Sequence, residues 1–224
     1  AQMRRGDLDA ATTWAERSCA EAERLGLEGG RPPALRVLAE IATREGRLEE
    51  AEARIREALA GFEANGSGPG RSRMLNQLGE LARHRGQLEE AVRWYEEGLE
   101  AAYELGAGLA VVAAFNLVLC RAQQGRWSDA WRLLQRHQVE ARARGNPTIG
   151  LGVALLLLGV HAHRGSWGRW DAQLEAARRL KEATGGFTED DHRRCLALSL
   201  AALEGLGEEA RVARARTLED PARP

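Results

Sequence analysis

The chain has 224 residues, with 32 basic and 33 acidic side chains and a net charge of −1. This balance excludes the strong positive charge with which proteins bind nucleic acid or an anionic membrane directly. The longest apolar run, residues 149–160, is shorter than the roughly 17 residues that a membrane-spanning helix needs.

The cysteines and the first residues give two expectations about context. Cys19, Cys120 and Cys195 are odd in number and far apart in sequence, which favours a reducing compartment, the cytoplasm, over a disulfide framework. No signal peptide precedes the first repeat, and the opening AQMRRG is typical of the last turn of a helix. We therefore expect a fragment of a larger protein.

One segment, Leu75 to Gly106, contains a complete helix, turn and second helix, and the rest of the chain repeats it. Its turn begins at Gly86 (GQLEEA), and similar turns begin at Gly6 (GDLDAA), Gly46 (GRLEEA), Gly125 (GRWSDA), Gly165 (GSWGRW) and Gly205 (GLGEEA). Successive starts lie about 40 residues apart, and self-similarity at such a period indicates a stacked repeat array.

The first part of the chain predicts three helices. Residues 7–25 and 48–62 carry apolar or small side chains at every third or fourth position, the rhythm of an amphipathic helix. Between them, residues 34–45 follow Pro32-Pro33, which suits a helix start because the first turn has unpaired N–H groups. The following stretch, ANGSGPGR at 64–71, predicts an irregular linker.

This linker raises the question of a phosphate-binding loop. A P-loop needs a strand before the glycines and a Lys-Ser or Lys-Thr after them, so that backbone N–H groups and the Lys hold the phosphates. The sequence offers no strand and only Arg71-Ser72. We favour a helix cap at Ser72 instead.

The second half is more apolar. Residues 109–120 and 149–160 are apolar on nearly all sides, which predicts burial on more than one face. The helices that follow, 127–143 and 167–183, begin with Trp127 and Trp131 and with Trp167 and Trp170. Rings at these spacings adjoin on one helix face, and packing between repeats is favoured over an aromatic ligand cage.

The C-terminal part predicts one more pair of helices. Thr188, followed three residues later by Asp191, is close to a capping box and predicts a helix over 189–204. A last helix over 207–218 precedes the tail EDPARP, whose prolines cannot continue it. This helix is expected to cap the array.

Catalytic and metal-binding patterns find little support. His161 and His163 lie two residues apart, so on a helix they point in different directions and cannot both bind one metal unaided. Glu49-Glu50, Glu89-Glu90 and Ser128-Asp129 occupy the same repeat turn, which favours solvated turns over catalysis. We predict no catalytic, cofactor-binding or metal-binding residue, no cofactor, and no enzymatic activity.

The central unit resembles the tetratricopeptide repeat. The resemblance rests on Leu78, Gly79, Gly86, Ala91, Tyr95 and Leu99, with Leu38, Ala39, Gly46, Ala51, Ile55 and Ala58 at matching positions one unit earlier. It implies that Gly79 and Ala91 let paired helices approach closely while Tyr95 fills the space between them. Trp170 departs from the family, since a small Ala is expected there.

The resemblance implies an all-α fold, an α-solenoid with the right-handed superhelix of stacked antiparallel helix pairs. The predicted single repeat domain, 1–224, has five to six repeats: a partial repeat 1–26, repeats at about 32–64, 71–106, 107–145, 147–184 and 188–218, and a tail 219–224. These repeats are longer than the family's usual length of about 34 residues, as in arrays of large bacterial signalling proteins with a Ser/Thr kinase or STAND ATPase domain.

In the family, the first helices line a groove that holds a peptide or partner segment. Carried over, the groove residues are Arg73, Asn76, Glu80 and Arg83, then Phe115 and Leu119, then Leu155. Charged ends of a mixed peptide would meet Arg73 and Arg83, and an apolar anchor would lie near Phe115. The alternative is that the apolar residues of this expected groove only pack against other parts of the repeat array and bind no partner.

The leading hypothesis is a scaffold or sensor that binds a protein or peptide, which can be another domain of the parent chain, within a bacterial cytoplasmic signalling protein. No direct nucleic-acid or membrane partner is expected. A second hypothesis is a small-molecule sensor, in a transcriptional regulator, with a closed pocket between 109–120 and 149–160. A third is the regulatory region of a Ser/Thr kinase or STAND-type ATPase.

Overall fold

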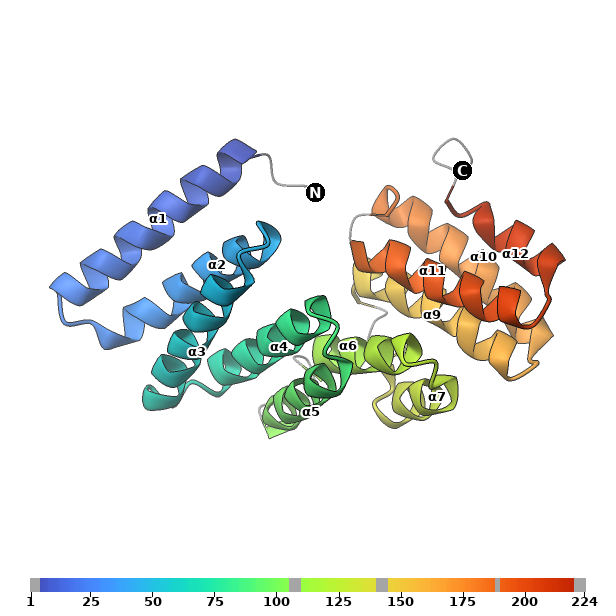
Figure 1. Cartoon of the computed structure of the whole chain (residues 1–224), viewed down its shortest axis with the longest axis horizontal. Coiled ribbons are helices and arrows are strands. Elements are labelled where there is room, and N and C mark those ends of the chain that lie inside the picture. Colours follow the sequence, from blue (N-terminus) through green and yellow to red (C-terminus); the bar gives the residue numbers. More distant parts are fainter. Residues whose placement is uncertain (1–4, 105–109, 140–144, 188–189, 220–224) are drawn as a thin grey trace. The chain divides into compact units, whose positions relative to one another are not determined.

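The protein is all-helical throughout the part that the computed structural model describes, residues 5–104, 110–139, 145–187 and 190–219 (Figure 1). It divides into two compact units, residues 1–113 and 114–224. The helices of unit 1 are α1 (Arg5–Arg24), the short 3₁₀ helix η1 (Glu28–Gly30), α2 (Arg31–Arg44), α3 (Leu48–Ala64), α4 (Gly68–His84) and α5 (Leu88–Glu104). α6 (Ala110–Gln123) crosses the boundary, and unit 2 continues with α7 (Trp127–Arg136), α9 (Pro147–His163), α10 (Trp167–Thr184), α11 (Asp190–Gly205) and α12 (Glu209–Arg216).

Left-handed glycines end most of these helices. Gly46 has a φ of 74°, and beyond it the Arg47 N–H donates to the Ala42 carbonyl at 2.9 Å, which closes a Schellman turn after α2. A side chain with a Cβ is strained at such a φ, so the sequence needs Gly there. A positive φ angle is also found at Gly26, Gly66, Gly86, Gly125, Gly165, Gly185, Gly186 and Gly207. The chain therefore reverses about every 20 residues and forms stacked helix pairs.

The segment predicted as an irregular linker with a cap at Ser72 is different in the structure. α4 begins at Gly68, and Ser67 is its cap, because the Ser67 hydroxyl accepts a hydrogen bond from the Gly70 N–H at 3.3 Å. Ser72 is buried and donates to the Gly98 carbonyl of α5 at 2.9 Å. Gly70 lies in the first turn of α4, and a side chain there is excluded because the Phe62 ring lies 2.2 Å from where a Cβ would be.

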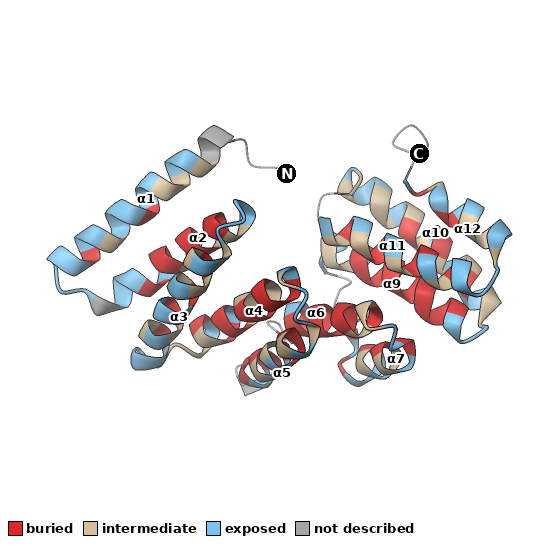
Figure 2. Cartoon of the chain, viewed as in Figure 1, coloured by how far each residue is buried: buried red, intermediate tan, exposed pale blue. Residues whose placement is uncertain are grey.

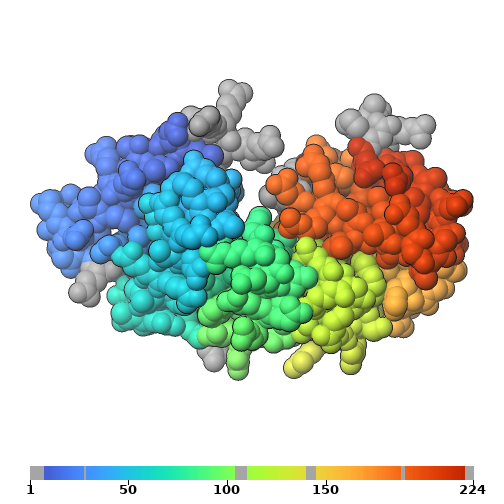
Figure 3. All heavy atoms as spheres, viewed as in Figure 1, coloured from blue at the N-terminus to red at the C-terminus, as the bar shows by residue number. Residues whose placement is uncertain are grey.

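In unit 1 each helix contacts the next one along the chain, and α2 also contacts α4. Figure 3 shows the corresponding order of colours from α1 to α5. A core of buried residues from three successive helices includes Leu35, Ile55 and Met74. The close approach predicted at Gly79 is confirmed, since a Cβ there would lie 2.5 Å from Cε1 of Tyr95, whose side chain is fully buried.

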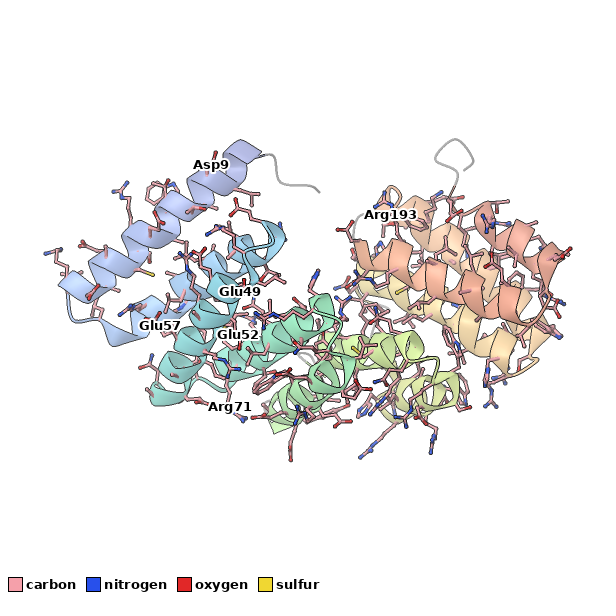
Figure 4. All side chains as sticks on the ribbon, in the orientation of Figure 1. Asp9, Glu49, Glu52, Glu57, Arg71 and Arg193 are labelled. Atoms are coloured by element: carbon pink, nitrogen blue, oxygen red, sulfur yellow. The ribbon has the colours of Figure 1, made fainter. Side chains whose placement is uncertain are left out.

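One ion pair repeats in unit 1. Arg31 lies 2.6 Å from Glu57, and forty residues later Arg71 lies 2.6 Å from Glu97. Each pair joins the start of a first helix to the second helix of the same repeat, and Figure 4 labels Glu57 and Arg71. These side chains are a third to a half exposed, so each pair adds at most about 1 kcal/mol and mainly marks the register.

Unit 2 is built around α9, whose residues 151–162 are all buried (Figure 2). α9 contacts α7, α10 and α11. The rings of Phe115 and Trp127 lie against Gly152 and Gly159, where a Cβ would approach them to 2.7 and 2.5 Å. Ser199 of α11 fixes the second contact, because its hydroxyl donates to the Leu155 carbonyl at 2.6 Å and accepts from the Gly159 N–H at 3.0 Å. The predicted burial of this apolar helix on more than one face is confirmed.

Three sequence-based boundaries need correction. The helix expected over 127–143 is interrupted, because α7 ends at Arg136 and Gln138 has a φ of 48°. The last interhelical glycine in a left-handed conformation is Gly207, while Gly205 still belongs to α11. Gly6 lies inside α1 rather than in a turn. The capping box predicted at Thr188 lies outside the described residues.

Among the described residues, none of the helices combines the length and the apolar character required to cross a bilayer. The fold is the predicted one: an all-α stack of tetratricopeptide-like helix pairs.

Candidate functional site

The polar residues expected to line a groove share one face of α4. Arg73 is exposed, Asn76 and Glu80 are half-buried, and the Asn76 side-chain amide donates to Glu80 Oε1 at 2.9 Å. Arg83 is 7% exposed and belongs to the interior. The Arg73 side chain of α4 is therefore exposed to solvent and those of Asn76 and Glu80 are partly exposed, whereas little of the Arg83 side chain is exposed.

α2 continues this polar face one repeat earlier. Arg36 and Glu40 stand forty residues before Asn76 and Glu80, and α2 and α4 are in contact. Glu40 is held 2.7 Å from Arg44 and 3.7 Å from Arg36. We call Arg36, Glu40, Arg73, Asn76 and Glu80 the first-helix surface. It carries both signs of charge, and Arg73 makes no ion pair within the described part of the chain.

The apolar part of the expected groove is interior. Phe115 is 7% exposed, and Leu119 and Leu155 are fully buried. The Phe115 ring is already in contact with α9 at Gly152. These positions favour the packing alternative over a partner anchor, and the rings against α9 also fill space that a ligand pocket beside it would need.

The four tryptophans of unit 2 are buried or lie against arginines. Trp127 and Trp170 are buried, as expected for packing between repeats, and Trp170 fits despite replacing a small residue. Trp131 and Trp167 are half-buried. Arg164 lies 5.0 Å from the Trp131 ring and Arg211 lies 4.0 Å from the Trp167 ring. Guanidinium groups therefore occupy the faces that a cationic ligand would use.

His161 and His163 behave differently, as expected from their spacing. His161 is buried beside Trp131, with ring centroids 6.0 Å apart, whereas His163 is exposed. Loss of water contact, with smaller contributions from Arg169 and Arg164, lowers the pKa of His161 below its ordinary value of 6.5. The described residues contain no group of three or more His, Cys, Asp or Glu side chains that could hold a metal ion.

An arginine-lined cavity in unit 2 was not anticipated from the sequence. It has a volume of about 340 Å³ and is lined by Arg121 of α6 and by Asp129, Arg132, Leu133 and Arg136 of α7. Asp129 pairs with both Arg126 and Arg132, and the hydrogen bond from Arg132 lowers the pKa of Asp129. One feature of the sequence could have indicated this cavity. Arg136 occupies the repeat position that is a glutamate, Glu57 or Glu97, in the two earlier repeats.

Comparison with known families supports the repeat assignment for part of the chain. Residues 30–104, which include α2 to α5, match the tetratricopeptide repeat family. No curated protein matches the sequence. The match covers the two repeats in which the recurring Arg–Glu pair and the first-helix surface lie.

Solved structures share the fold over a larger part of the chain. BtubC from P. vanneervenii is 20% identical with a TM-score of 0.69, and the match covers 97% of this chain and 96% of that one. A putative kinesin light chain from Podosopora anserina with nearly identical TPR-like repeats is 17% identical, with a TM-score of 0.58 over 80% and 89%. A Rap protein complexed with competence and sporulation factor is 12% identical, with a TM-score of 0.63 over 95% and 68%. At these identities the likeness concerns the fold.

Proposed function

We propose that this protein is a non-catalytic scaffold that binds a protein or peptide segment on the first-helix surface of unit 1. The observation that carries the proposal is the exposed Arg73 beside the Asn76–Glu80 pair, with Arg36 and Glu40 in register on the neighbouring first helix. The similar Rap structure contains competence and sporulation factor, so this helical stack is compatible with a bound partner.

The chemistry of the surface suggests an extended segment of mixed charge. Glu40 and Glu80 occur at the same repeat position, so two basic side chains separated by one repeat step would each meet a carboxylate. Arg73, which has no internal ion pair among the described residues, would meet an acidic side chain or a terminal carboxylate. Ion pairs at such a rim set specificity and association rate more than affinity.

A capture experiment tests the proposal. Partners bound by the immobilised wild-type chain are identified, and the bound segment is synthesised as a peptide and titrated. The double variant Arg73→Ala, Glu80→Ala should weaken binding about tenfold or more, because it removes two charged contacts. The matched variant Arg93→Ala, Glu100→Ala, on the exposed face of α5, should leave binding unchanged. Equal affinities for all three proteins would refute the proposed surface.

We place the scaffold within a bacterial cytoplasmic signalling protein, as regulatory region or sensor. The support is the long repeat period and the three cysteines, which form no disulfide among the described residues and of which Cys120 and Cys195 are buried. The alternative parents are a Ser/Thr kinase and a STAND-type ATPase. The coding sequence upstream of Ala1 tests this assignment, since either enzyme would show its own motifs there: a glycine-rich loop with a catalytic Asp, or a P-loop.

A further inference from the structure

The arginine-lined cavity of unit 2 is where the repeat pattern of charges is reversed. In the first two complete repeats, Arg31 pairs with Glu57 and Arg71 pairs with Glu97. The third repeat, counted from Gly125, has Ala110 and Arg136 at these two positions. The second-helix position is therefore basic in the third repeat instead of acidic. The first-helix position that carries its arginine partner in the earlier repeats is an alanine.

This exchange removes the acidic side chain that pairs with the first helix in the two earlier repeats. Arg136 makes no ion pair with any residue that the structure describes, and its side chain is exposed at the end of α7. A cation at a helix C-terminus is favourable by itself, which accounts for one arginine there. It does not account for the other two arginines that line the same cavity.

Arg121 is the least expected of these residues. The corresponding residues of the two earlier repeats are Ala42 and Ala82, both buried at the end of a first helix. Arg121 instead extends a guanidinium to the cavity and donates to the side chain of Gln124 at 3.0 Å. A long charged side chain has thus replaced a buried methyl group at the place where Arg132 and Arg136 converge.

Among the described residues, the lining of the cavity has a net positive charge. It includes three arginines and one carboxylate, Asp129. Asp129 is already engaged by Arg126 and Arg132. Leu133 adds an apolar part to the lining, so the site has both a charged rim and a surface for aliphatic carbons. Planar guanidinium groups bind the oxygens of carboxylate and phosphate groups with paired hydrogen bonds.

We infer that the cavity lined by Arg121, Arg132, Leu133 and Arg136 binds an oxyanion group, carboxylate or phosphate, carried by a protein segment. The site belongs to unit 2 and is separate from the first-helix surface of unit 1. The inference rests on the proposed function in one respect: it takes the anion to be carried by a protein segment. The anion site itself is tested with small probes.

Calorimetric titration of the whole 224-residue chain tests the inference. The probes are a short peptide with two adjacent glutamates, the same peptide with phosphoserine in their place, and inorganic phosphate. Saturable binding of the glutamate peptide identifies a carboxylate site. Saturable binding of only the phosphoserine peptide and phosphate identifies a phosphate site. Affinity should decrease with added salt, because the contacts are exposed and charged.

Arg136→Glu is the decisive variant, since it restores the residue type of the two earlier repeats at an exposed position. It should weaken binding of the preferred probe about tenfold or more. Arg132→Gln, also exposed, should weaken it in the same direction. The matched control is Arg93→Glu, which makes the same change in net charge at the position of Arg132 one repeat earlier. It should leave affinity within about twofold.

Two results would overturn the inference. One is the absence of saturable binding of all three probes to the wild-type chain. The other is an equal loss of affinity in Arg136→Glu and in Arg93→Glu, which would show a response to net charge alone. The variant Arg73→Ala, Glu80→Ala separates the two sites, because it should weaken partner binding at the first-helix surface about tenfold or more while leaving the affinity for the anion probes unchanged.

Discussion

Gly79 illustrates at the residue scale how tightly the helix pairs approach each other. An added Cβ would lie 2.5 to 2.9 Å from three ring atoms of Tyr95. The Tyr95 side chain is fully buried and has no space into which to move. We expect Gly79→Ala to lower the free energy of unfolding by about 1–3 kcal/mol through overpacking. Urea unfolding followed by circular dichroism measures this change.

Gly168 is the matched control for Gly79, because it also lies inside a helix. No atom lies within 4 Å of where its Cβ would be, so Gly168→Ala meets no obstacle. The alanine should raise the free energy of unfolding by about 0.5–1 kcal/mol, since it restricts the unfolded chain more than glycine does. Destabilisation of the same size in both variants would mean that helix packing at Gly79 is not the cause.

His161 gives the protein a dependence of stability on pH. Its folded-state pKa is lowered, first by burial and then by Arg169 and Arg164, so the unfolded chain binds the proton more tightly. Its contribution to stability is therefore complete above the ordinary value of 6.5 and is lost as the pH falls from there towards the folded-state pKa. His161→Gln should flatten the decrease in unfolding free energy between about pH 7 and 5.

The exposed His163 is the control for this measurement. It lies on the same helix two residues away, and His163→Gln makes the same substitution at an exposed position, where it should change the free energy of unfolding by less than about 0.5 kcal/mol. Denaturant midpoints at a series of pH values compare the three proteins. A profile that keeps its full slope in His161→Gln would show that other groups produce the pH dependence.

At the scale of the element, α12 is held by stacking of arginine on tryptophan more than by apolar burial. Among its residues Ala215 alone is buried. Arg211 lies 4.0 Å from the Trp167 ring of α10, and Arg214 lies 5.3 Å from the Trp170 ring and 2.7 Å from Asp171. Stacking of this kind is worth about 0.5–2 kcal/mol, with the lower values where the contact is exposed to solvent.

Arg211→Ala should therefore loosen α12 while α9 and α10 remain folded. Amide hydrogen exchange within Glu209–Arg216 should accelerate about tenfold, which corresponds to the loss of one such contact. Arg193→Ala on α11 is the control, because Arg193 is exposed and stacks on no ring among the described residues (Figure 4). Unchanged exchange of α12 in Arg211→Ala would show that burial of Ala215 and Leu218 suffices to hold the helix.

The helix pattern could be predicted wherever a local signal decides it. Gly46, Gly86, Gly125 and Gly165 end helices because only a left-handed residue closes the turn, and the sequence shows them directly. The end of α7 was missed because no glycine or proline marks it, and Gln138 has a positive φ. Ser67 was overlooked as a cap because the glycines beside it suggested an irregular linker, whereas Gly70 is part of α4 and is a glycine because the Phe62 ring occupies the place of its Cβ.

At the scale of the whole molecule, repeat register shows which positions are equivalent from one repeat to the next, but not how exposed they are. Arg73 and Glu80 follow from repeat register alone. Phe115 and Leu155 occupy corresponding positions but are buried, because residues from other helices cover them, as Phe115 itself covers Gly152. Exposure depends on these tertiary contacts, which periodicity does not contain. The same register does distinguish Arg136 from its acidic equivalents, so charge reversals between repeats are a more direct guide to a site than apolar content.

Division into two units also predicts how a local defect spreads. In a repeat array each element interacts mainly with its neighbours, so stability is distributed along the chain and parts of it open separately. Destabilising unit 1 by Gly79→Ala should accelerate hydrogen exchange in α4 and α5 by about fivefold or more, the factor that corresponds to about 1 kcal/mol. α9 and α11 belong to unit 2 and should keep their wild-type exchange rates. A uniform acceleration through α11 would show instead that the chain opens as one cooperative body, in which a partner bound to unit 1 would also stabilise unit 2.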